Sequence, residues 1–150
     1  MKLLLAATSG GHFATMQSLK PFWSLHDRLW ITDPKSDTEN LCADGERVIW
    51  LPYQGPRDVG ALLGNLPQVV SILRKEQPDL IISTGSSIAV GFALVAKFLD
   101  IRFMYIESIS RSNDLSLSGK LVYPLCDELY VQWPKLSQKY PKAVFAGYVT

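Results

Sequence analysis

Cysteine, long apolar runs and an excess of charge of one sign are all scarce in this sequence. The two cysteines, Cys42 and Cys126, form no Cys-x-x-Cys pair, and no cysteine–histidine cluster has the spacing of a zinc site. We therefore expect two free, buried thiols, as is usual in a reducing compartment. The net charge of +1 gives no reason to expect nucleic acid as a partner.

No apolar run is long enough to act as a targeting or membrane-spanning segment. The run at residues 3–7 is shorter than the about seven to fifteen residues of a signal-peptide core and the about twenty of a spanning helix. We expect a cytoplasmic chain whose membrane contact is peripheral or made through a partner. The sequence also lacks a Gly-x-Ser-x-Gly elbow, a metal-ligand cluster and an Asp-x-Asp site, which argues against hydrolases of that type and against a metal-dependent transferase.

Short apolar runs alternate with segments of helical length. Strands are expected at residues 2–8, 28–32, 47–51, 79–83, 102–107, 128–132 and 143–146, and helices at residues 13–23, 59–77, 88–99 and 117–126. Gly60, Gly64 and Pro67 predict a break inside the second helix. Because the strands are continuous apolar runs, we expect one Rossmann-like α/β domain over residues 1–150, with a parallel sheet covered by helices on both faces.

Ligands of such sheets bind beyond the carboxyl ends of the strands, so the loops there are the candidate site. The first loop is Ser9-Gly10-Gly11-His12. Its glycines let backbone N–H groups approach an anion at a helix N-terminus, and His12 in the first turn would point into the cleft. The alternative is a plain tight turn capped by serine. A dinucleotide site is weakly indicated, because Asp33 is the only acidic residue placed to hold a ribose.

A second glycine loop, Gly85-Ser86-Ser87, follows the fourth strand and opens a helix. It could bind the same anion through backbone N–H groups. Simple helix capping by Ser86 or Ser87 is an equally good explanation. If two such loops lie on neighbouring strands, they face one cleft, which strengthens the case for an anionic ligand.

The loop after the fifth strand contains Glu107 and Arg111. Glu107 could accept a substrate hydroxyl or its proton, and Arg111 could hold a phosphate bidentately. A structural Glu–Arg pair that closes the loop is the alternative. Lys120 is a further candidate for phosphate binding, or else a solvated surface residue.

These motifs together resemble a known family. The resemblance covers nearly the whole chain and depends on Ser9-Gly10-Gly11-His12, Ser83-Thr84-Gly85, the block from Tyr105 to Lys120, Val131-Gln132-Trp133-Pro134 and Tyr140-Pro141. The chain resembles the oligosaccharide-biosynthesis proteins of the asparagine-linked-glycosylation fourteen type, and looks closest to their bacterial PssD-like counterparts in exopolysaccharide and capsule synthesis.

The resemblance implies the N-terminal half of a split GT-B glycosyltransferase. It is similar to the N-terminal domain of MurG, whose Gly-Gly-His loop and Glu-containing acceptor loop correspond to His12 and Glu107. The implied partner is a separate donor-binding chain that shares the UDP-sugar, and the implied acceptor is a polyprenyl-diphosphate-linked saccharide. No cofactor and no bound metal are implied.

The resulting hypothesis is an inverting sugar transfer without a metal. His12 is expected to be the general base, with Glu107 as its rival, while the glycine loops, Arg111 and Lys120 position the diphosphate. Apolar and basic side chains at residues 69–75 would contact the membrane. Two alternatives remain at this point: a non-catalytic scaffold that activates the partner transferase, and a stand-alone nucleotide- or flavin-binding α/β protein.

Overall fold

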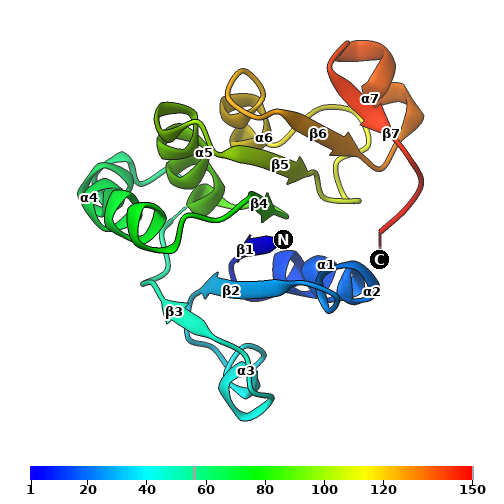
Figure 1. Ribbon diagram of the computed structural model, residues 1–150. Coiled ribbons are helices and arrows are strands. Elements are labelled where there is room, and N and C mark those ends of the chain that lie inside the picture. Colours follow the sequence, from blue (N-terminus) through cyan, green and yellow to red (C-terminus); the bar gives the residue numbers. More distant parts are fainter. Residues whose placement is uncertain (56, 150) are drawn as a thin grey trace.

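The computed structural model describes residues 1–55 and 57–149, and its central feature is a parallel β-sheet (Figure 1). The strands are β1 (Lys2–Ala6), β2 (Asp27–Thr32), β3 (Val48–Trp50), β4 (Leu80–Ser83), β5 (Arg102–Ile106), β6 (Glu128–Val131) and β7 (Ala143–Phe145). They are arranged in the order β3-β2-β1-β4-β5-β6-β7, and every neighbouring pair is parallel. The predicted Rossmann-like sheet is confirmed.

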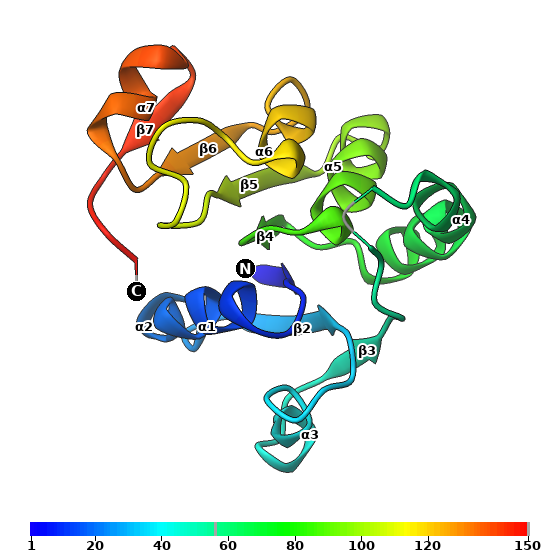
Figure 2. The ribbon, with the colours of Figure 1, turned by 180° about the vertical axis from the view of Figure 1, so that it is seen from behind.

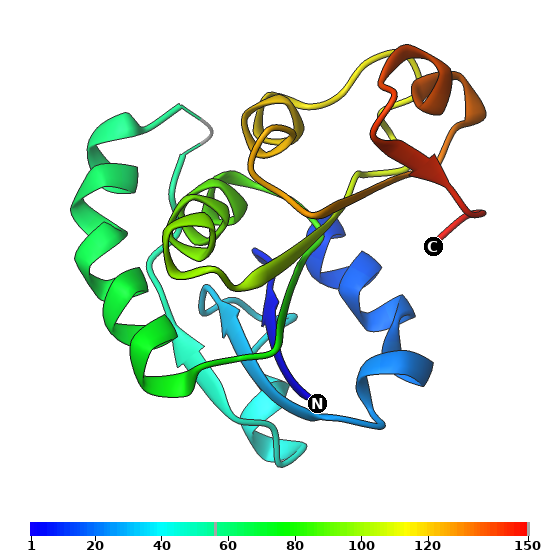
Figure 3. The same ribbon diagram turned by 45° about the horizontal axis from the view of Figure 1, so that its top comes forward.

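Helices cover both faces of this sheet (Figures 2 and 3). They are α1 (Gly11–Ser18), α2 (Lys20–Trp23), α3 (Asn40–Ala43), α4 (Val59–Glu76), α5 (Ser87–Leu99), α6 (Leu117–Val122) and α7 (Pro134–Lys139). Buried side chains of α4 to α7 pack on one face, and those of α1 to α3 pack on the other. The apolar strand residues alternate between these two cores, as the pleat of a strand requires.

The helix predicted at residues 13–23 is divided into α1 and α2. Pro21 explains the division, because it has no N–H group to continue the hydrogen-bond ladder of α1. The break predicted in α4 is wrong. Pro67 lies on the exposed face of that helix. Because proline has no N–H group, the carbonyl oxygen four residues earlier lacks its helical partner, and on this face it can bind water instead. Leu62 and Leu66 on the opposite face stay packed against the core.

Three further local predictions need correction. Helix α6 ends at Val122 rather than at residue 126, because Pro124 cannot continue it. The short helices α3 and α7 were not predicted at all. Both cysteines are free, as expected, but Cys42 is exposed on α3, which buries only Leu41 at the edge of the sheet.

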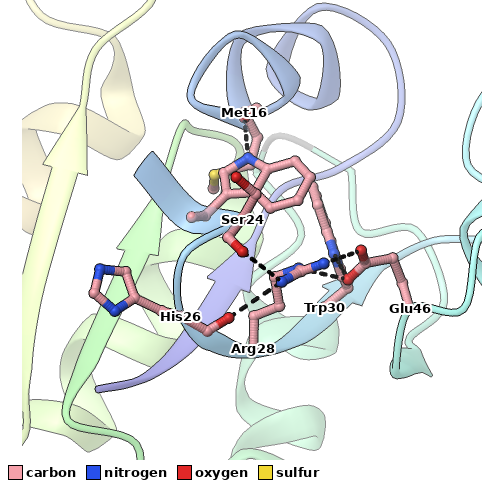
Figure 4. A network of polar contacts seen from close by, with 7 residues as sticks. Met16, Ser24, His26, Arg28, Trp30 and Glu46 are labelled. Carbon is pink, nitrogen blue, oxygen red and sulfur yellow. Dashed lines mark hydrogen bonds and ion pairs between the residues drawn. The ribbon is translucent and has the colours of Figure 1, made fainter. Parts of the chain in front are cut away.

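A hydrogen-bond network ties β2 to the start of β3 (Figure 4). The carboxylate of Glu46 accepts two N–H groups of Arg28, at 2.8 and 2.6 Å, and the indole N–H of Trp30 at 3.0 Å. The Arg28 guanidinium also donates to the carbonyl oxygen of His26 and lies 4.9 Å from the ring centroid of Trp23. The Glu46 carboxylate is therefore the acceptor for the guanidinium of Arg28 and for the indole N–H of Trp30, two donors that are partly buried.

We expect Glu46→Ala to lower the free energy of unfolding by about 2 kcal/mol, because it leaves the Arg28 and Trp30 donors without their acceptor. Urea denaturation followed by circular dichroism measures this loss. Asp44→Ala, which removes an exposed carboxylate two positions away, is the control and should change the value by less than about 0.5 kcal/mol. Equal losses for both variants would contradict a specific role for Glu46.

Candidate functional site

A cavity of about 550 Å³ lies at the carboxyl ends of the central strands. Its walls come from the loop after β1, the start of α5, the loop after β5 and the start of α6. The strand order reverses between β1 and β4, so the loops that follow these two strands diverge and leave a crevice between them. Of the predicted site residues, the cavity wall includes Ser9, Gly11, His12, Ser86, Ser87, Glu107 and Arg111, but it does not include Gly10, Gly85 or Lys120.

His12 is held by a hydrogen bond that fixes the position of its proton. Its Nδ1 atom lies 2.9 Å from the carbonyl oxygen of Thr84, and the hydroxyl of Thr84 in turn donates to the carbonyl oxygen of His12 at 2.6 Å. A carbonyl oxygen can only accept, so Nδ1 must carry the proton. In the neutral ring Nε2 then has the free lone pair. The geometry thus prepares Nε2 of His12 to accept a proton.

Gly85 has a different role from the predicted phosphate contact. A Cβ atom built at this position would lie 2.5 Å from Nδ1 of His12 and 2.6 Å from its Cε1. The backbone of Gly85 also has a φ of 130°, which side chains other than glycine rarely adopt. Glycine is needed here to make room for the imidazole ring. The predicted phosphate contact does not fit, because Gly85 is not on the cavity wall and its N–H donates to the hydroxyl of Ser83.

Gly85→Ala should displace the ring of His12 from the Thr84 carbonyl. Nitrogen-15 NMR of the imidazole should show a protonated Nδ1 in the native chain at a pH where the ring is neutral. In the variant the two tautomers should be mixed, because the bond that selects one is lost. Gly11→Ala is the control, since a Cβ atom there meets nothing within 4 Å; a native-like tautomer in Gly85→Ala would show that the contact does not position the ring.

The N–H groups of the first glycine loop are bound by the protein's own carboxylates. The Ser9 N–H and hydroxyl donate to Asp33 at 2.7 and 2.9 Å, and the Gly10 N–H donates to Asp37 at 2.7 Å. Asp33 is 2% exposed, so it anchors the loop rather than holding a ribose. The prediction that Ser9 and Gly10 bind phosphate therefore does not fit this arrangement. Gly11 remains on the cavity wall.

The start of α5 contributes Ser86 and Ser87 to the cavity wall. Neither serine caps the helix: the structure shows no side-chain cap at its N-terminus, and the Ser87 hydroxyl donates instead to the carbonyl oxygen of Gln54. The capping alternative is thus wrong. Ser86 has a φ of 77°, a strained conformation for a side-chain-bearing residue, and such strain is typical of functional sites. Helix α5 directs its positive N-terminal dipole into the cavity.

Glu107 organises the loop that follows β5, residues 107–116, which we call the acceptor loop. Its side chain is 1% exposed. One carboxylate oxygen accepts the N–H of Ser108, the other accepts the N–H of Ser116, and both contact the Ser116 hydroxyl at 2.9 to 3.1 Å. With these lone pairs already used, Glu107 is poorly placed to act as the general base, and the arrangement favours His12 over its rival.

Tyr105 completes this buried cluster. Its hydroxyl lies 3.4 Å from the hydroxyl of Ser116. Burial, and to a lesser extent the Glu107 carboxylate, raise the pKa of Tyr105 above its ordinary range. The phenol therefore stays protonated and neutral at the base of the acceptor loop.

Arg111 and Lys120 differ in their surroundings. Arg111 is exposed on the cavity wall, and the ion pairs found among the described residues include no Glu107–Arg111 pair, so the structural-pair alternative is wrong. Lys120 forms an ion pair with Asp114 at 2.8 Å. Hydrogen bonds from Lys120, Tyr140 and Lys139 hold the pKa of Asp114 below its usual range. Lys120 thus binds a carboxylate of its own chain outside the cavity, which corrects its assignment as a phosphate ligand.

Sequence reasoning missed several residues that shape the site. The carbonyl of Thr84 and the carboxylate of Asp37 leave no pattern in a sequence, because their roles depend on contacts between distant loops. Ser116 offered a signal, since it precedes Leu117 at the start of a predicted helix and caps it by accepting the Gly119 N–H at 3.0 Å. No group of histidine, cysteine or acidic side chains in residues 1–55 and 57–149 is arranged to hold a metal ion.

Comparison with known proteins identifies the family of the chain and agrees with the fold. The model of the family described as "Oligosaccharide biosynthesis protein Alg14 like" matches residues 59–149. A UDP-N-acetylglucosamine transferase subunit ALG14 from Yarrowia lipolytica is 39% identical, over 97% of this chain and 80% of its own length. This chain belongs to the Alg14 family. The human ALG14 subunit is 38% identical over 51% of this chain and 38% of its own length.

Solved structures show the same fold at low identity. MurG of Acinetobacter baumannii superimposes with a TM-score of 0.70 at 15% identity, over 91% of this chain but only 43% of MurG. A UDP-GlcNAc 2-epimerase from Methanocaldococcus jannaschii gives 0.72 at 16% identity, over 98% and 45% of the two chains. The Alg14-family chain thus has the fold of about half of each of these larger enzymes.

Proposed function

We propose that this chain is the acceptor-binding subunit of a two-chain glycosyltransferase. The complex would transfer a sugar from a UDP-sugar to a polyprenyl-diphosphate-linked saccharide, in exopolysaccharide, capsule or lipid-linked oligosaccharide synthesis. The observation that supports this most directly is the His12 imidazole in the cavity, with Nδ1 bonded to Thr84 and Nε2 available as a base. The family relatives are named as subunits of UDP-N-acetylglucosamine transferase, so UDP-N-acetylglucosamine is the first donor to test.

The chemistry follows from the position of one base. Nε2 of His12 takes the proton of an acceptor hydroxyl, and the oxygen attacks the anomeric carbon from the side opposite the leaving UDP. A single displacement of this kind inverts the anomeric carbon. Glu107 keeps the acceptor loop in place during this step and does not exchange protons with the substrate.

The acceptor diphosphate would bind between the start of α5 and the acceptor loop. Ser86 and Ser87 present the positive end of α5 at one side of the cavity, and the Arg111 guanidinium is exposed at another. A guanidinium binds two phosphate oxygens at once, and a helix N-terminus adds backbone N–H donors. These groups replace Ser9, Gly10, Gly85 and Lys120, the residues first expected to bind the diphosphate.

The donor-binding part would come from a second polypeptide. The MurG and 2-epimerase chains are both more than twice as long as the portion that this chain matches. The cavity lies at the carboxyl ends of the strands, where a second domain could cover it. We propose that the partner chain binds the UDP-sugar and closes this side, so that neither chain alone completes the site.

The proposal is tested by reconstituting the chain with the donor-binding chain that co-purifies with it. Transfer of radiolabelled N-acetylglucosamine to a polyprenyl-diphosphate saccharide is measured. His12→Ala should lower kcat by about 100-fold or more, because the general base is lost. His26→Ala changes the only other histidine, which lies just before β2 and outside the cavity wall, and should leave kcat nearly unchanged.

Other outcomes of this assay identify the alternatives. Near-native activity of His12→Ala, combined with loss of activity when partner binding is blocked, would show a scaffold instead of a catalytic subunit. Product formation or tight nucleotide binding by the isolated chain would show a protein that works alone.

The membrane contact predicted at residues 69–75 does not fit the structure. Val69, Ile72 and Leu73 are buried in the core, at 3, 7 and 1% exposure. The adjoining Glu76 pairs with Lys2 at the start of β1, so this end of α4 lies at the edge of the sheet opposite the cavity. Nor does any helix in the described part of the chain combine the length and apolarity needed to cross a bilayer.

An apolar patch beside the cavity suits a membrane surface better. Val59 and Leu63 of α4 are 62 and 59% exposed, and Leu117 and Leu121 of α6 are 44 and 48% exposed. Val59, Leu117 and Leu121 line a common hollow of about 280 Å³, and Leu117 also lines the cavity. We propose that these four residues lie against the cytoplasmic membrane face and admit the apolar tail of the acceptor.

Replacing Leu117 and Leu121 together by serine should weaken sedimentation of the chain with phosphatidylethanolamine–phosphatidylglycerol vesicles by about tenfold or more, because two leucines lose their apolar burial. Phe98→Ser provides the control. Phe98 is 84% exposed near the C-terminal end of α5, outside the residues that line the hollow and the cavity. If Phe98→Ser weakens binding as much as the double variant does, the patch is not the membrane contact.

A further inference from the structure

Two side chains that follow β6 lie between the acceptor loop and a segment far along the chain. These are Gln132 and Trp133, and the segment is residues 146–149, which we call the closing segment. It runs from β7 back towards α1 and α2 (Figures 1 and 2). Neither residue has a role in the proposed chemistry, and Gln132 is a polar side chain at 1% exposure. A buried amide of this kind has to find both a donor and an acceptor.

Gln132 uses its amide group in two directions. Its Nε2 donates to the carbonyl oxygen of Glu107 at 3.1 Å, and its Oε1 accepts the backbone N–H of Val149 at 2.6 Å. One side chain thus joins the first residue of the acceptor loop to the closing segment. The assignment of the amide nitrogen and oxygen follows from the partners, because a carbonyl oxygen accepts and a backbone N–H donates.

Trp133 makes a second, parallel connection. Its indole N–H donates to the carbonyl oxygen of Ile109, two residues further along the acceptor loop, at 2.6 Å. On the other side its ring meets that of Tyr148 edge-on, with centroids 6.0 Å apart. Two adjacent residues therefore contact the acceptor loop and the closing segment at the same time.

The closing segment also forms one wall of a second hollow. This is an apolar groove of about 290 Å³ on the face of the sheet that α1 and α2 leave open, with Ile82, Met104 and Ile106 in its floor. Gln132 and Tyr148 belong to this groove, whereas Ile109 and Arg111 belong to the cavity. Gln132 thus connects Glu107 on the cavity wall to the segment that lines the groove, and we call the contacts of Gln132 and Trp133 the bridge.

We propose that Gln132 and Trp133 are positioning residues. They hold the acceptor loop in its conformation as long as the closing segment keeps its contacts with them. They hold the carbonyls of Glu107 and Ile109, so the loop keeps Arg111 on the cavity wall only while the closing segment is in place. The effect of this bridge on catalysis rests on the proposed function. The contacts between the acceptor loop and the closing segment belong to the chain itself and can be tested without an activity assay.

Hydrogen–deuterium exchange on the isolated full chain tests the link. Val149→Pro removes the N–H donor to Gln132, while Val149→Ala keeps it and serves as the matched control. Gln132→Glu removes the donor to Glu107, and Gln138→Glu, on an exposed position of α7, introduces the same charge nearby. We expect the Ser108 and Ser116 amides to exchange about fivefold faster in Val149→Pro and Gln132→Glu, as for the loss of one hydrogen bond. Unchanged exchange of these amides in both variants would overturn the proposal.

The reconstituted complex gives the second readout. Gln132→Glu should raise KM for the polyprenyl-diphosphate acceptor by about fivefold and leave KM for the UDP-sugar unchanged. A general loss of folded protein would lower the amount of active enzyme and would not separate the two KM values. If the native complex transfers no sugar while the exchange result holds, the proposed function fails and the bridge stands; equal changes in both KM values would show that the bridge does not act on the acceptor loop.

Discussion

The reversal of strand order between β1 and β4 is the constraint on which the site depends. Each strand of a parallel sheet delivers its loop to the same edge, but only at a reversal do two neighbouring loops turn away from each other. Here the crevice at the reversal accommodates the His12 side chain. The reciprocal hydrogen bonds between His12 and Thr84 connect the segments that follow β1 and β4. The cavity and the orientation of the His12 ring thus result from the order in which the strands pair.

The two glycine loops look alike in sequence and act differently in the structure. At the first, Asp33 and Asp37 occupy the N–H groups of Ser9 and Gly10. At the second, the missing side chain of Gly85 makes room for the imidazole ring of His12, and the adjoining start of α5 has no side-chain cap. The two loops therefore differ in what their N–H groups contact, although the sequence patterns at α1 and α5 suggest an anion site equally strongly.

Much of the fold could be predicted because it depends on local patterns. The continuous apolar runs located all seven strands, and the loops at their carboxyl ends include His12, Ser86 and Arg111. What could not be predicted depends on contacts between distant segments. The ring of His12 over Gly85 is such a contact, as is the ion pair of Lys120 with Asp114. Pro67 misled for another reason: a proline inside a helix is costly, but the packing of Leu62 and Leu66 against the core keeps α4 continuous across it.

Side chains that perform chemistry usually weaken the fold that holds them, because they are kept in an arrangement that suits the substrate rather than the protein. The ring of His12, which we propose to be the base, instead binds the carbonyl oxygen of Thr84, a residue that is 1% exposed. Without the imidazole that buried carbonyl would lose a hydrogen-bond partner and the space above Gly85 would lie empty. The residue proposed as the general base therefore also stabilises the loop against which it packs.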